Sequence, residues 1–109
     1  MQNGTYKTLF KTPLGDGSGV IIIDGDNIRG GDSSMYYIGT KEQNGENISA
    51  KIIANVHTNV PGMSSVFGVD HVNITLEGTT KGDTASMSGE AKEAPGVPFE
   101  VTITKIDAA

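Results

Sequence analysis

The sequence predicts a single all-β domain over residues 1–109, an antiparallel up-and-down meander of about seven or eight strands. Apolar and polar side chains alternate with a period of two along several segments, and clusters of turn-forming residues separate these segments. The 109 residues are 36% hydrophobic and include 15 glycines, a composition that supports one modest core and many short strands. Closing into a barrel leaves a meander without free edges, so we expect a small barrel, with a short sandwich as the alternative.

The alternation places the strands along the chain. It is clearest over residues 47–57, where large and small apolar side chains share one face and only Ile53 interrupts the polar face. Residues 18–24 are apolar on both faces, so we place them centrally or against a partner chain. We expect further strands over residues 4–12, 70–78 and 98–106, and one that carries the two adjacent tyrosines. The side chains expected to face inward are Tyr6, Thr8, Phe10, Ile48, Ala50, Ile52, Ala54, Val56, Val72, Ile74, Leu76, Phe99, Val101 and Ile103.

Turn-forming residues punctuate these strands. The glycine-rich residues 15–19 predict a flexible hairpin or bulge, because no lysine follows them and the next segment is a β run and not a phosphate-binding helix. Only residues 61–67 have helical character, enough for one or two turns. The turn at residues 24–27 is expected to be type I′-like. We expect turns at residues 14–19, 24–27, 43–46, 78–83 and 94–98.

Charge and composition exclude several classes of function. Lys and Arg number 8 against 13 Asp and Glu, a net charge of −5, so the basic surface typical of nucleic-acid and anionic-membrane binding is missing. The chain has no cysteine, which excludes disulfides and thiolate metal sites. The longest aliphatic run, residues 20–23, is shorter than a signal-peptide core, so we expect a cytoplasmic location.

No group of residues has the spacing of a catalytic or metal site. The turn at residues 24–27 opens like a calcium loop, but Met35 stands where the bidentate glutamate belongs. His57 and His71, with Asp70, are expected to be surface residues on neighbouring strands, since nothing in the sequence brings them to one ion. We therefore expect a non-enzymatic protein without a cofactor or a metal.

The densest unusual segment begins with Gly30 and Gly31. Adjacent glycines permit a kink or a close approach of strands, and the Asp32 carboxylate can accept hydrogen bonds from nearby backbone N–H groups that hold the bend. The strand that follows carries Tyr36 and Tyr37. The segment predicts a barrel corner, and its tyrosines could also line a pocket or an interface.

This segment also carries a family resemblance. The chain resembles the GrlR family, most closely its short bacterial homologues, through residues 3–7 (NGTYK), 30–40 (GGDSSMYYIGT) and 59–68 (NVPGMSSVFG). The resemblance implies a calycin-like antiparallel β-barrel that forms a homodimer. The founding member is a negative regulator of a type III secretion pathogenicity island, and it sequesters a transcriptional activator through an acidic Glu-Asp-Glu-Asp loop. The matching loop here, residues 41–47, keeps two carboxylates, and the resemblance implies that the partner-binding residues are Glu42, Gln43, Asn44, Gly45 and Glu46.

Two functions follow as hypotheses. The first is a non-enzymatic regulatory domain that forms a homodimer and binds a protein partner. The alternative is a barrel that carries a small hydrophobic ligand in its interior. The inward side chains are mostly aliphatic with few aromatics, which favours a filled core; an elongated interior cavity would instead favour a carrier.

Overall fold

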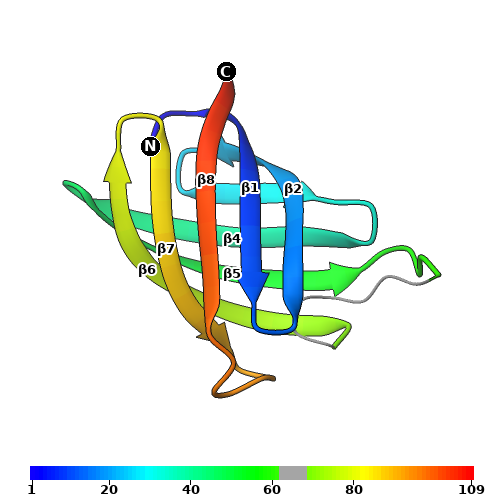
Figure 1. Cartoon of the computed structure of the whole chain (residues 1–109). Coiled ribbons are helices and arrows are strands. Elements are labelled where there is room, and N and C mark those ends of the chain that lie inside the picture. Colours follow the sequence, from blue (N-terminus) through cyan, green and yellow to red (C-terminus); the bar gives the residue numbers. More distant parts are fainter. Residues whose placement is uncertain (62–68) are drawn as a thin grey trace.

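The computed structural model describes residues 1–61 and 69–109, and within them the chain forms a closed eight-stranded barrel. Each strand pairs antiparallel with its neighbour in sequence, and the last strand also pairs with the first. Figure 1 shows β8, β1 and β2 side by side, with β4 and β5 running across behind them. The predicted barrel is therefore confirmed, and the sandwich is not formed. The strands are β1 (Gly4–Thr12), β2 (Gly15–Asp24), β3 (Asn27–Gly31), β4 (Met35–Asn44), β5 (Asn47–Val56), β6 (His71–Lys81), β7 (Thr84–Ala91) and β8 (Phe99–Ala108).

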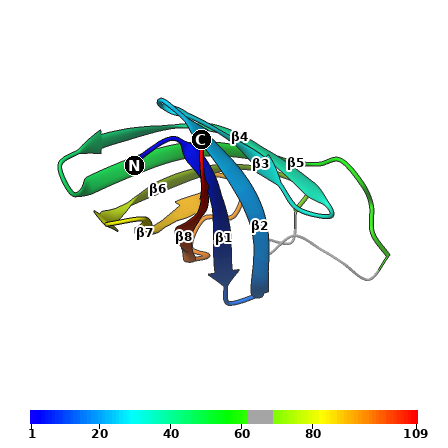
Figure 2. The same ribbon diagram turned by 90° about the horizontal axis from the view of Figure 1, so that it is seen from above.

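The period-two pattern correctly divided inside from outside. Viewed from above, the sheet curls around an interior that β1 and β2 bound on one side and β4 and β5 on the other (Figure 2). The side chains expected inward are buried or half-buried, while Ile53 points outward and is 42% exposed. Burying these apolar side chains supplies the main favourable free energy for closing the barrel.

The predicted turn at residues 14–19 is wrong, because Gly15 to Gly19 form the first half of β2 and pair with β1. The turn is only Pro13 and Leu14. Phe10 explains why a glycine-rich run is held in a strand. A Cβ atom on Gly17, its cross-strand partner, would lie 2.4 Å from the Phe10 ring, so the ring packs directly over the glycine backbone.

The predicted turn at residues 78–83 is too long, and β7 was not predicted as a strand. Gly78 lies within β6, where a Cβ atom would be 1.9 Å from the Ser86 carbonyl oxygen of β7. The inward side chains of β7 include only Ala85, Met87 and Ala91, and after Thr84 the strand has none of the β-branched residues that usually mark one.

Three hairpins turn through the same two-residue geometry. Gly25, Gly45 and Gly82 each occupy the first central position with φ between 61° and 63°, and no other residue type in the described ranges has a positive φ. A positive φ at the first position alone is the type II′ pattern, so the expected type I′-like turn at residues 24–27 is wrong in type although right in place. Glycine adopts this φ without steric cost.

The two ends of the barrel therefore differ. The terminal end, as we call it, holds both chain termini and the three glycine turns (Figure 1). The opposite end, the loop end, holds the turn at residues 13–14, the β3–β4 loop at residues 32–34 and the β7–β8 connection at residues 92–98. Longer connections on a rigid barrel are where binding residues are usually found.

Two further points concern helices. Of the helical turn predicted at residues 61–67, residues 62–67 lie outside the described residues. In the part of the chain that the structure describes, no helix has the length and apolar character needed to span a membrane.

Candidate functional site

A cavity of about 340 Å³ lies inside the barrel toward the loop end. Its walls are mainly apolar side chains from most of the strands, among them Ile21, Ile28, Met35, Val72, Ile74, Leu76, Met87, Val101 and Ile103. The expectation of a filled core is wrong. On β5, Ala50 and Ala54 flank Ile52 on the inward face, and these methyl groups leave space that larger side chains would fill.

Polar side chains gather where the cavity reaches the loop end. Asp16 and Ser18 come from the start of β2, and Asp32, Ser33 and Ser34 form the β3–β4 loop. The cavity thus combines an apolar body with a polar rim, which is the usual composition of a small-molecule site.

Asp32 is the centre of the polar rim. Its Oδ1 accepts hydrogen bonds from the backbone N–H groups of Ser34 at 2.9 Å and Met35 at 2.7 Å. Its Oδ2 accepts a hydrogen bond from the Tyr37 hydroxyl, and its own N–H donates to the Met35 carbonyl at 2.9 Å. The carboxylate therefore holds the β3–β4 bend in the way the sequence predicted.

Gly30 and Gly31 allow β3 to approach its neighbours closely. A Cβ atom on Gly30 would lie 2.1 Å from the Val20 carbonyl oxygen, and one on Gly31 would lie 2.8 Å from the Met35 carbonyl oxygen. The expectation of a close strand approach is confirmed for both glycines. Their φ angles lie outside the positive range. Glycine is therefore required at these two positions because it has no side chain, and not because the backbone is unusual.

The two adjacent tyrosines point to opposite faces of β4. Tyr37 lines the cavity and its ring meets Phe10 edge to face, with ring centroids 6.2 Å apart. Tyr36 lies outside and is 40% exposed. Burial first, and then the hydrogen bond to Asp32 and its charge, raise the pKa of Tyr37 far above its ordinary value, so its hydroxyl remains a hydrogen-bond donor.

Thr8 adds a polar group to the cavity wall. The residue is only 4% exposed and lines the cavity. Thr8 pairs with Gly19 across β1 and β2, and a Cβ atom on Gly19 would lie 2.9 Å from the Tyr37 hydroxyl oxygen. Thr8, Tyr37 and Asp32 therefore form one polar cluster on the cavity wall. Alternation placed Thr8 inward, but nothing in the sequence indicated that its hydroxyl would face a cavity.

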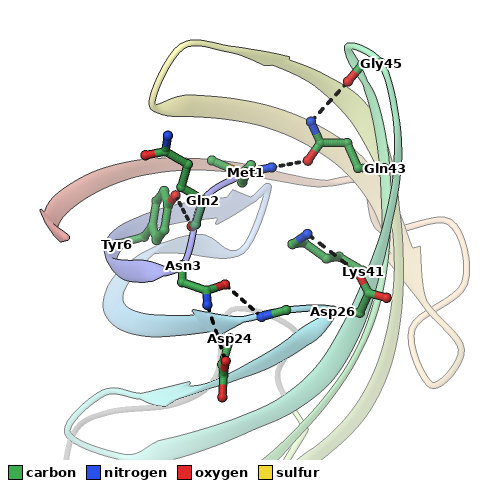
Figure 3. Close-up of polar contacts among 10 residues, drawn as sticks. Met1, Gln2, Asn3, Tyr6, Asp24, Asp26, Lys41, Gln43 and Gly45 are labelled. Carbon is green, nitrogen blue, oxygen red and sulfur yellow. Dashed lines mark hydrogen bonds and ion pairs between the residues drawn. The ribbon is translucent and has the colours of Figure 1, made fainter. Parts of the chain in front are cut away.

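The terminal end is bridged by the N-terminal segment. Tyr6 donates a hydrogen bond to the Gln2 carbonyl at 2.6 Å, and the Asn3 side chain accepts one from the Gly25 N–H at 2.8 Å (Figure 3). The terminal ammonium of Met1 donates to the Gln43 side chain. These contacts tie the segment to the turn after β2 and to the end of β4, away from the cavity.

Lys41 was expected in an exposed loop, and this is wrong. It lies on β4, pairs with Ala50 of β5, and its side chain is 6% exposed with Nζ 3.9 Å from the Asp26 carboxylate (Figure 3). Its position follows the same alternation as Tyr37, four residues earlier, so it points inward. Burial first, and then the charge of Lys41, lower the pKa of the Met1 ammonium.

The residues that the family resemblance assigned to partner binding are all exposed. Glu42, Gln43 and Asn44 end β4, and Gly45 and Glu46 form the type II′ turn before β5. They lie at the terminal end, whereas the cavity reaches the loop end. The structure thus separates the predicted acidic turn from the cavity.

The histidines are surface residues, as expected. His57 Nε2 lies 2.9 Å from the Asp32 carbonyl oxygen, and the His71 ring contacts the Asn55 and Asn73 side chains. Across residues 1–61 and 69–109, no group of three His, Cys, Asp or Glu side chains is placed to hold a metal ion.

A second surface of note is the outer face of β2, β4 and β5. Val20, Ile22, Tyr36, Ile38 and Ile53 are 38% to 53% exposed on this face. Ile38 pairs directly with Ile53, and the exposed Arg29 of β3 lies between Ile38 and Ile22 in the same cross-strand row. This apolar patch explains why residues 18–24 are apolar on both faces: Ile21 and Ile23 point into the barrel, whereas Val20 and Ile22 point outward and belong to the patch.

Comparison with known proteins adds no assignment. Neither protein-family models nor curated proteins match the chain.

Proposed function

We propose that the chain is a non-enzymatic binding protein that holds a small, mainly apolar ligand inside its barrel. The observation that carries this proposal is the interior cavity of about 340 Å³ with an apolar wall and a polar rim. Small-molecule sites commonly have volumes of about 300 to 1,000 Å³ and this division of polarity.

The cavity volume sets the size of the ligand. One water takes about 30 Å³ of liquid and an apolar cavity of about 150 Å³ binds benzene, so 340 Å³ accommodates roughly 11 non-hydrogen atoms. A fatty-acid-sized chain would have to project beyond the rim.

The test is binding of the neutral fluorescent probe naphthalene, whose size the cavity accommodates, together with native mass spectrometry of freshly purified protein. We expect a saturable fluorescence increase that Ala54→Leu reduces at least fivefold in affinity, because the larger side chain occupies the cavity. Ile53→Ser is the matched control, since it changes the adjacent residue on the outer face of β5 and should leave the affinity within twofold. Equal loss in both variants, or no saturable binding, would contradict the proposal.

A second candidate is a regulatory domain that binds proteins, as the resemblance to the GrlR family suggests. The observation that favours it is the apolar patch on β2, β4 and β5, since groups of exposed large apolar side chains on small domains often mark protein interfaces. We propose that a second copy of the chain covers this patch in a homodimer. The acidic turn of Glu42 to Glu46 would remain free for a regulatory partner, and the net charge of −5 supports a partner other than nucleic acid.

Light scattering with size-exclusion chromatography tests the dimer. We expect Ile22→Lys with Ile38→Lys to give a monomer, because each would bury an unpaired charge in the interface. Thr75→Lys, an exposed position on β6, is the control that should stay dimeric. A monomeric wild-type protein at high micromolar concentration would rule out the dimer without affecting the cavity proposal. The cytoplasmic location remains a prediction, tested by fractionation of host cells.

A further inference from the structure

The charge of the cavity lining restricts the chemical class of ligand. Asp16 and Asp32 contribute carboxylates to the lining, and none of the described lining residues is Lys, Arg or His. A carboxylate or phosphate group drawn into this site would lose its hydration without gaining a cationic partner, and it would face two like charges.

Asp32 retains the capacity to accept a hydrogen bond from a ligand. Its carboxylate already accepts bonds from two backbone N–H groups and from the Tyr37 hydroxyl, and a carboxylate offers about four acceptor positions. These three donors also fix its orientation at the rim. The carboxylate is therefore a positioned acceptor that cannot itself supply a proton to a ligand oxygen while ionised.

Thr8 adds a second polar group to the site. It is only 4% exposed and lines the same cavity, and its cross-strand partner Gly19 lies close to the Tyr37 hydroxyl. A threonine hydroxyl can donate one hydrogen bond and accept others. A ligand head at the Thr8–Tyr37–Asp32 cluster would therefore meet both a donor and acceptors.

We infer that the ligand is an uncharged or cationic amphiphile, with an apolar body of roughly ten non-hydrogen atoms and a hydrogen-bond-donating head such as an alcohol or an amine. The head lies at the Thr8–Tyr37–Asp32 cluster and the body lies among the aliphatic side chains of the cavity. Anionic amphiphiles of the same length are rejected. This inference rests on the proposed interior binding site and adds the chemistry of its ligand.

The test compares three ligands that share one chain and differ in the head: 1-decanol, decylamine and decanoate, each titrated below its aggregation concentration in competition with naphthalene at neutral pH. We expect decanol and decylamine to displace the probe at least tenfold more effectively than decanoate. Equal or stronger displacement by decanoate overturns the inference while leaving the interior site in place. Displacement by none of the three, with the probe bound, also overturns the inference, and absence of probe binding overturns the proposed function itself.

Charge variants locate the origin of the selectivity. Asp16→Asn and Asp32→Asn each remove one rim carboxylate. We expect each variant to lower the ratio of decylamine affinity to decanoate affinity at least threefold. Asp16 is exposed and makes none of the bonds that hold the β3–β4 bend, so its variant remains informative if Asp32→Asn fails to fold. Asp107→Asn removes the same charge at the terminal end and should leave the ratio unchanged. If Asp107→Asn lowers the ratio equally, the selectivity arises from the net charge of the protein and not from the position of the two rim carboxylates.

Thr8→Val removes the Thr8 hydroxyl with almost no change in the shape of the side chain. We expect decanol affinity to fall at least threefold while the affinity for the probe stays within twofold. An unchanged decanol affinity would show that the ligand head does not lie at the Thr8–Tyr37–Asp32 cluster.

Discussion

Replacing Ala54 by leucine should stabilise the protein, although large side chains introduced into cores normally destabilise them. Ala54 is 3% exposed and its methyl group faces the 340 Å³ cavity. Leucine adds roughly three methylene-sized groups, and at about 0.8 kcal/mol each their burial contributes about 2.4 kcal/mol. Restricting the leucine rotamers costs about 0.5–1 kcal/mol. The free energy of unfolding should therefore rise by about 1.5 kcal/mol, measured by equilibrium unfolding in urea.

Ala85→Leu is the matched control for this prediction. Ala85 is 1% exposed and also points inward from a strand, but it does not line the cavity. The same substitution there should lower the free energy of unfolding by about 1–3 kcal/mol, as overpacking does. If Ala54→Leu destabilises the protein as much as Ala85→Leu, the interior next to Ala54 is already filled, and the argument for a ligand site fails.

Three further predictions concern the polar rim and the close approach of β3. Asp32→Ala should lower the free energy of unfolding by roughly 2–4 kcal/mol in urea, because the Ser34 and Met35 N–H groups and the Tyr37 hydroxyl lose their acceptor; a change below about 0.5 kcal/mol would contradict the bend-holding role. Because the pKa of Tyr37 is raised in the folded protein, its neutral form stabilises the fold fully below pH 10.0, and this stabilisation is lost as the pH rises further. In alkaline unfolding followed by circular dichroism, the wild-type protein should therefore lose stability above pH 10.0 more steeply than Tyr37→Phe. Parallel curves would show that Tyr37 does not control the loss of stability at high pH. Gly30→Ala should lower the free energy of unfolding by about 1–3 kcal/mol, since its Cβ atom would meet a β2 carbonyl oxygen at 2.1 Å, and an unchanged midpoint would mean that the strands separate freely.

The fold could be predicted from sequence wherever side-chain alternation was strong. Residues 47–57 and 98–106 alternate aliphatic and polar side chains, and the structure forms β5 and β8 there. Prediction failed where the determinant lies on another strand. Gly17 is held in β2 by the Phe10 ring, and Gly78 in β6 by the approach of β7, neither of which a local reading of glycine as a turn former can detect.

The candidate site was less predictable than the fold, for a related reason. The Asp32 bend was foreseen because its acceptors and donors lie within five residues of one another. The cavity was not, because its volume depends on how small side chains such as Ala50 and Ala54 meet residues from strands far away in sequence. Alternation assigns a residue to the inside, but only packing decides whether the inside is filled.

The two ends of the barrel differ in how open they are to the interior cavity. Tight glycine turns and the bonded N-terminal segment occupy the terminal end, where Tyr6 and Lys41 are buried below the cavity. The cavity reaches the loop end, where the Asp32 bend is held by its own hydrogen bonds rather than by ladder pairing. Under the proposed function, a ligand would enter past Asp16 and Asp32, so these two carboxylates would meet it before the apolar wall does. The selection against anionic ligands should consequently appear in the association rate as well as in the affinity, and it should weaken as salt screens the exposed Asp16 charge.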